Sequence, residues 1–131
     1  MSSQRMRILS PQDASLAVLI VKDIAHEAGL GGLKISALTT AVSELTTNVV
    51  KYAEHGLLTV QVLERKQLRG IEVIVEDRGP GIANIPLAME DHVSTGGTLG
   101  LGLPGTKRMV DEFEIQSTLG SGTSVRIVKW S

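Results

Sequence analysis

Glu44 and Asn48 are the two residues of this sequence whose types and spacing could do chemistry together. They stand in the stretch Ser43–Ala53, "SELTTNVVKYA". Residues four apart in a helix project from one face, and Lys51 lies near the same line, at the margin of the apolar stripe. An acid and an amide bordering the core are costly unless something uses them. The pair is either an ordinary solvated i, i+4 pair, or a carboxylate that orients or deprotonates a nucleophile beside an amide that binds a hard cation.

A second candidate is Asp77–Ile82, "DRGPGI", which directly follows the apolar run "IEVIVE". Glycine permits a positive φ or a close approach of the backbone to another body, and proline stiffens the bend. The aspartate sits where a side chain can reach out from the sheet edge. Such a segment is either only a tight turn or a surface against which a ligand lies, and the local sequence leaves both possibilities open.

Two further glycine-rich segments follow, Ser94–Arg108 ("STGGTLGLGLPGTKR") and Leu119–Val125 ("LGSGTSV"). In the first segment, several glycines precede a predicted helix, where exposed N–H groups and the helix dipole favour binding of an anion. A flexible loop before a helix would have the same composition. It fits neither a P-loop nor a Rossmann fingerprint, because the required preceding strand is missing. The second predicts a hairpin turn, after which the hydroxyl of Thr123 could also meet a ligand.

Hydrophobic periodicity predicts the elements that position these residues. Ser10, Pro11 and Asp13 form a capping box for a helix that Gly29 closes. The predicted order is strand, helix, helix, strand, strand, loop, helix, strand, strand, which favours helices on one face of a mixed sheet, an α/β (α+β) two-layer sandwich. The remaining predicted elements are strands at Arg5–Leu9, Leu58–Glu64, Ile71–Glu76, 113–118 and 123–130, a helix ending before Gly56, and a helix over about Leu103–Glu112.

Composition bounds the remaining possibilities. The 131 residues predict one domain, 1–131, and the absence of cysteine excludes disulfides and thiolate chemistry. The longest aliphatic run, Leu16–Val21, is far too short to span a bilayer, so we expect a soluble, cytoplasmic protein. A net charge of −1 with scattered basic residues and 2% aromatics argues against nucleic acid as a partner. We expect His26, His55 and His92 to have structural or solvated roles.

Taken together and in this order, the four segments resemble the signature of the Bergerat nucleotide-binding fold. This fold is shared by gyrase, Hsp90, histidine kinases and MutL, the GHKL ATPases. The resemblance lies in Glu44–Asn48 as the Asn box and in Asp77–Gly81, Gly100–Gly102 and Gly120–Thr123 as the three glycine boxes. Within the superfamily, the chain is most similar to the small bacterial serine/threonine kinases related to anti-sigma factors, and among them to the RsbT-type switch kinases of the stressosome.

The stretches "AVSELTTNVVKYA", "VEDRGPGIANI", "MEDHVSTGGTLGLGLPGTKRMVDEF" and the ending "IVKW" carry this resemblance over nearly the whole chain. One departure concerns the phosphates. Anti-sigma relatives commonly carry an arginine ahead of the second glycine box, where this chain has Ser94 and Thr95. Backbone groups and Lys107 or Arg108 are then the expected phosphate contacts.

The resemblance implies an Mg²⁺- and ATP-dependent kinase. Adenine would rest on Asp77, the phosphates over the backbone of Gly100–Gly102, and Mg²⁺ on Asn48. Glu44 would be the catalytic residue that accepts the proton of the attacking serine. Residues 82–97 would form a lid over the triphosphate. The implied nucleotide-binding residues are Asn48, Lys51, Asp77, Gly79, Gly81, Ile82, Gly97, Thr98, Leu99, Gly100, Leu101, Gly102 and Thr123.

The resemblance also implies partners. The substrate would be a serine of a STAS-domain protein of a stressosome, and the released kinase would bind and activate a PP2C-type phosphatase. Two alternatives remain open. One is a regulatory binding module, anti-sigma-like, with little or no turnover. The other is a detached ATP domain of a histidine kinase that acts in trans.

Overall fold

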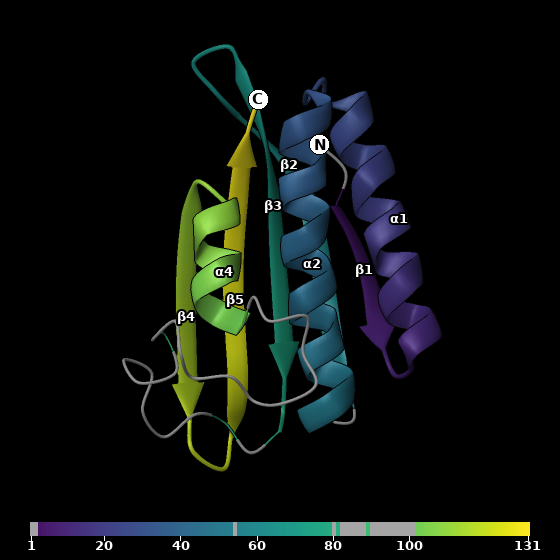
Figure 1. Cartoon of the computed structure of the whole chain (residues 1–131), viewed down its shortest axis with the longest axis vertical. Coiled ribbons are helices and arrows are strands. Elements are labelled where there is room, and N and C mark those ends of the chain that lie inside the picture. Colours follow the sequence, from purple (N-terminus) through teal and green to yellow (C-terminus); the bar gives the residue numbers. More distant parts are fainter. Residues whose placement is uncertain (1–2, 54, 80, 82–88, 90–101) are drawn as a thin grey trace.

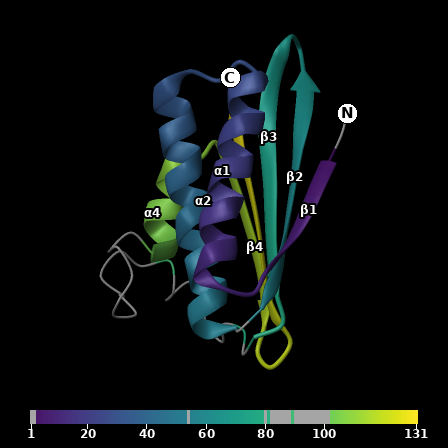
Figure 2. The ribbon, with the colours of Figure 1, turned by 90° about the vertical axis from the view of Figure 1, so that its right-hand side faces the viewer.

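The chain folds into two layers, a five-stranded sheet and helices that all lie along one of its faces (Figures 1 and 2). The structure, a computed structural model, describes residues 3–53, 55–79, 81, 89 and 102–131. The predicted α+β two-layer sandwich is confirmed. In chain order the elements are β1 (Ser3–Ile8), α1 (Pro11–Glu27), α2 (Gly32–Tyr52), β2 (Gly56–Arg65), β3 (Leu68–Asp77), α4 (Gly102–Met109), β4 (Glu112–Thr118) and β5 (Gly122–Trp130).

The strands lie in the order β1-β2-β3-β5-β4, and every neighbouring pair is antiparallel. The expectation of a mixed sheet was therefore wrong. As predicted, two helices separate β1 from β2, and because they run in opposite directions, β2 enters the sheet antiparallel to β1 (Figure 1). The strands β3 and β4 do run in the same direction, but β5 lies between them, so no parallel pair forms.

The predicted cap of α1 is confirmed. The backbone N–H of Asp13 donates to Ser10 Oγ at 3.2 Å, and Pro11 occupies the first helical position. The Asp13 carboxylate accepts from the N–H of Leu9 at 2.9 Å, so it secures the residue before the cap. Gly29, with φ +89°, turns the chain out of the helix as predicted. No helix in the described part of the chain is long and apolar enough to cross a membrane.

Most strand boundaries differ from the prediction by a few residues, and two differences have a clear structural cause. The β2–β3 hairpin is longer, because Lys66 (φ 51°) and Gln67 (φ 71°) make a tight turn in the left-handed region that this dipeptide does not signal. The helix α4 ends at Met109 rather than near Glu112. The N–H of Asp111 donates to the carbonyl of Val128 at 2.9 Å, which commits the chain to β4 at Glu112.

The core lies between the two layers, where fully buried aliphatic side chains meet. Leu38 and Val42 on α2 pack in one cluster with Val73 on β3 and Ile127 on β5. Since successive strand residues point to opposite faces, the intervening residues of β3, β4 and β5 face away from the helices. The helix α2 therefore packs against the middle of the sheet.

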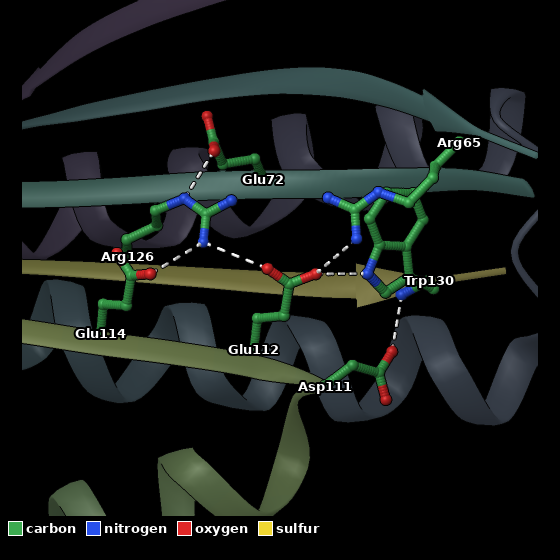
Figure 3. A network of polar contacts seen from close by, with 7 residues as sticks. All are labelled: Arg65, Glu72, Asp111, Glu112, Glu114, Arg126 and Trp130. Atoms are coloured by element: carbon green, nitrogen blue, oxygen red, sulfur yellow. Dashed lines mark hydrogen bonds and ion pairs between the residues drawn. The ribbon is translucent and has the colours of Figure 1, made fainter.

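A polar network occupies the opposite face of the sheet (Figure 3). Arg126 Nε donates to Glu72 Oε2 at 2.7 Å, and a second guanidinium nitrogen donates to Glu112 Oε1 at 3.3 Å. The other oxygen of Glu112 accepts from the indole N–H of Trp130 at 2.7 Å. These bonds join β3, β4 and β5 on the side away from the described helices.

Candidate nucleotide-binding site

The helix α2 buries the predicted Glu44–Asn48 pair one turn apart. Glu44 is only 2% exposed, so it lies deeper than the margin of the apolar stripe that its sequence position indicated. Glu44 Oε1 and Asn48 Oδ1 are both shielded from solvent, and neither has a hydrogen-bond partner among the described residues. Lys51, in the last turn of the same helix, is exposed.

Two such acceptors on one helix face are unusual in a folded protein. The large majority of buried polar atoms are hydrogen-bonded, and a buried acceptor without a partner costs about 1–3 kcal/mol. By contrast, the nearby buried Thr46 satisfies its hydroxyl on the carbonyl of Val42 at 2.8 Å. The Glu44 and Asn48 oxygens are therefore suited to a ligand that brings donors or a cation.

At the end of β3, Asp77 is held by two backbone N–H groups. Its Oδ1 accepts from Gly79 at 2.9 Å and from Thr123 at 3.3 Å. Both bonds use the same oxygen, so neither engages Oδ2. The two bonds to Oδ1 therefore fix the orientation of the carboxyl group, and neither of them occupies Oδ2.

The glycines after Asp77 have a structural reason that the sequence did not reveal. A Cβ at Gly79 would come within 2.7 Å of Ala53 Cβ, just beyond the end of α2. At Gly81, where φ is +75°, a Cβ would lie 2.2 Å from the carbonyl oxygen of Thr118. Gly79 therefore lies close against the end of α2 and Gly81 close against the β4–β5 hairpin, and these protein contacts explain why glycine stands at both positions.

A row of three polar side chains crosses the sheet at this end. Thr123 pairs with Asp77 on one side and with Ser117 on the other. The Ser117 and Thr123 hydroxyl oxygens lie 2.8 Å apart. Sequence reasoning found Asp77 and Thr123 but missed Ser117. The signal was present: Ser117 follows the inward-facing Phe113 and Ile115 at period two, in the strand that pairs with β5.

The second glycine box lies almost wholly outside the described residues. Also outside the described residues are the predicted nucleotide contacts Ile82 and 97–101, the residues Ser94 and Thr95, and the predicted lid apart from Met89. Gly102 is described and begins α4 with φ +56°, and the hydroxyl of Thr106 donates back to its carbonyl at 3.0 Å. Lys107 and Arg108 are both exposed on α4.

Comparison with known proteins decides what kind of domain carries these features. Residues 9–129 match the histidine kinase-like ATPase domain family. This chain belongs to that family.

The chain is similar to two kinds of named bacterial protein. The serine/threonine-protein kinase RsbT of Bacillus subtilis (strain 168) is 40% identical over 125 residues, which are 95% of this chain and 94% of RsbT. The anti-sigma F factor of Caldanaerobacter subterraneus is 32% identical over 125 residues, 91% of this chain and 86% of that protein. The predicted resemblance to RsbT-type serine/threonine kinases is confirmed.

Solved structures share the fold of this histidine kinase-like ATPase domain. The RsbU and RsbW domains of Rv1364c from Mycobacterium tuberculosis superpose with a TM-score of 0.66 at 18% identity, covering 98% of this chain and 32% of that one. The mycobacterial sensor histidine kinase MprB gives a TM-score of 0.58 at 18% identity, covering 98% and 97%. At these identities the likeness concerns the fold alone.

Proposed function

We propose that this protein is an Mg²⁺- and ATP-dependent serine/threonine protein kinase of the GHKL type. The observation that carries the proposal is the pair of buried acceptors, Glu44 Oε1 and Asn48 Oδ1, which have no partner in the described part of a histidine kinase-like ATPase domain. Asp77 would hold the adenine base from the end of β3. The likeness to RsbT, a named serine/threonine kinase, supports protein phosphorylation as the reaction.

The residues present fit a magnesium ion at Asn48. Amide oxygens are ligands for hard cations, and Asn48 Oδ1 is a buried oxygen in need of a partner. No group of three or more His, Cys, Asp or Glu side chains that could hold a metal exists among the described residues. This agrees with Mg²⁺, which is commonly held by one or two protein oxygens together with phosphate oxygens and water. When bound, the ion would offset the charge that develops on the phosphates.

Glu44 would act as the general base. A serine hydroxyl of the substrate would attack the γ-phosphorus, forming a new oxygen–phosphorus bond while the bond from that phosphorus to the β,γ-bridging oxygen breaks and ADP leaves. Glu44 would orient the hydroxyl and accept its proton. Burial in α2 suits this role, because a carboxylate shielded from water interacts strongly with a donor that reaches it.

The proposed substrate is a serine of a STAS-domain protein of a stressosome. We propose a PP2C-type phosphatase as the partner that the released kinase activates by binding, in a cytoplasmic stress or sigma-factor pathway. The names of the relatives, RsbT and anti-sigma F factor, support a regulatory protein that acts on other proteins. The anti-sigma relatives also favour a second candidate, a nucleotide-binding module that regulates by binding with little turnover.

Incubation with γ-labelled ATP, Mg²⁺ and a STAS-domain protein distinguishes these functions. If the protein is a serine kinase, we expect acid-stable phosphoserine on the STAS-domain partner. Glu44→Gln should then lower the rate of phosphoryl transfer by about 10²–10⁴-fold while ATP still binds. Binding of ATP without transfer would favour the regulatory module, and acid-labile phosphate would favour a histidine kinase domain acting in trans. Transfer at an unchanged rate in Glu44→Gln would remove Glu44 from its role.

A further inference from the structure

Asp77, Thr123 and Ser117 lie side by side on three adjacent strands, β3, β5 and β4. The backbone N–H of Thr123 donates to Asp77 Oδ1 at 3.3 Å, which ties the first two together. The hydroxyl oxygens of Thr123 and Ser117 are 2.8 Å apart, which ties the second to the third. All three residues are partly buried.

The direction of the protons in this row follows from a third bond. The Ser117 hydroxyl donates to the carbonyl oxygen of Gly122 at 3.0 Å, and a carbonyl has no proton to give in return. A serine hydroxyl carries a single proton, so while Ser117 donates to Gly122 it accepts in its bond with Thr123. The Thr123 hydroxyl is then the donor to Ser117, so it can only accept a hydrogen bond from any further partner.

This polarity matters for a base that lies against Asp77. An ionised carboxylate is an acceptor only, and the Thr123 hydroxyl beside it is left as an acceptor as well. Adenine carries an amino group at position six, which has two N–H donors. Guanine and hypoxanthine carry a carbonyl oxygen at that position, which would meet two acceptors and no donor.

We infer that Ser117 is a positioning residue that fixes the proton of Thr123 and so makes the Asp77 end of the proposed nucleotide site select a 6-amino purine over a 6-oxo purine. The inference rests on the proposed function, since it requires a nucleotide whose base lies against Asp77. Without Ser117, the Thr123 hydroxyl could turn its proton towards a 6-oxo group and accommodate it. With Ser117, that rotation breaks a hydrogen bond.

The test compares the affinities of the full-length protein for ATP and for ITP, its 6-oxo analogue, in the presence of Mg²⁺, by competition with a fluorescent ATP analogue. The wild type should prefer ATP. Ser117→Ala should reduce the ATP-to-ITP preference by about two- to tenfold, the value of one neutral hydrogen bond. Most of this change should come from tighter ITP binding. Ser117→Thr, which keeps the hydroxyl, should retain the preference.

The ratio separates positioning from mere stability, because loss of folded protein lowers both affinities alike. Gln116→Ala is the matched control, since this neighbour points to the other face of β4 and should leave the ratio unchanged. An unchanged ratio in Ser117→Ala, or equal weakening of both nucleotides, would overturn the inference while wild-type ATP binding still supported the proposed function. Failure of the wild type to bind ATP at all would overturn the proposed function, and the inference with it.

Discussion

The indole ring of Trp130 lies directly over Gly70, its partner across β3 and β5. A Cβ at position 70 would come within 2.6 Å of ring atom Cε3. The guanidinium of Arg65 covers the ring at 4.9 Å from its centroid, and Glu112 accepts from its N–H (Figure 3). The only tryptophan of the chain is thus held at one end of the sheet face that lies opposite the helices α1, α2 and α4.

This contact predicts that Gly70→Ala destabilises the protein, although alanine is otherwise the better residue in a strand. The new methyl group must displace the ring, and overpacking of this kind costs about 1–3 kcal/mol. Urea unfolding followed by Trp130 fluorescence and by circular dichroism measures the change. In a Trp130→Ala background, measured by circular dichroism alone, Gly70→Ala should be neutral or stabilising. An equal loss in both backgrounds would contradict the contact.

The Glu112 carboxylate predicts a pH dependence of stability. The hydrogen bond from Trp130, followed by those from Arg126, lowers the pKa of Glu112 below its ordinary value of 4.5. Because the folded-state pKa is the lower one, the stabilisation is complete above about pH 4.5 and is lost as the pH falls through the folded-state pKa. The difference in unfolding free energy between wild type and Glu112→Gln should therefore shrink between pH 7 and pH 3. Glu76→Gln, at an exposed carboxylate of β3, is the control, and a difference that grows in acid would refute the assignment.

Two glycines of the β4–β5 turn provide a matched pair. Gly122 has φ +113° and a Cβ there would lie 2.1 Å from the carbonyl oxygen of Asp77, whereas Gly120 has φ +82° with nothing within 4 Å. Gly120→Ala should cost only the left-handed strain, about 1–2 kcal/mol. Gly122→Ala should cost clearly more and should also weaken ATP binding, because it displaces Asp77. Equal unfolding free energies in urea for the two variants would show that the close approach carries no weight.

The local sequence was sufficient for the helix layer and for the order of the elements. Ser10, Pro11 and Gly29 mark the ends of α1 through local hydrogen bonds and backbone preferences, which act within a few residues. The spacing of Glu44 and Asn48 likewise predicted a shared face, because helical periodicity is local. What it could not give was the depth of Glu44, which depends on how α2 packs against the sheet.

Contacts between distant segments were beyond the sequence. The insertion of β5 between β3 and β4, which makes the sheet antiparallel throughout, is a choice among strand pairings that alternation alone does not rank. The role of Ser117 depends on that same pairing. Similarly, the sequence marked Gly79 and Gly81 as a constrained turn without its cause, because their neighbours, Ala53 and Thr118, lie more than 20 residues away along the chain.

The buried carboxylate of Glu44 predicts a conflict between stability and function. Glu44→Met replaces an acceptor without a partner by an apolar side chain of similar size, so the nucleotide-free protein should gain about 1–3 kcal/mol in unfolding free energy. The same variant should lose phosphoryl transfer. Urea unfolding without nucleotide gives the first quantity. Thr46→Val, which removes a hydroxyl that has a partner, should not stabilise. A destabilised Glu44→Met would mean that the carboxylate is satisfied before any ligand binds.

The most direct test measures, by calorimetry, how ATP affinity depends on Mg²⁺ in the wild type and in Asn48→Ala. It asks whether nucleotide and metal are the partners of the buried acceptors on α2. In the wild type, Mg²⁺ should strengthen ATP binding by at least about tenfold, the value of one charge-assisted contact. Asn48→Asp, which keeps an oxygen at this position, should retain an enhancement. In Asn48→Ala the enhancement should nearly vanish. An Asn48→Ala protein whose ATP affinity responds to Mg²⁺ as strongly as the wild type would contradict the assignment of the site.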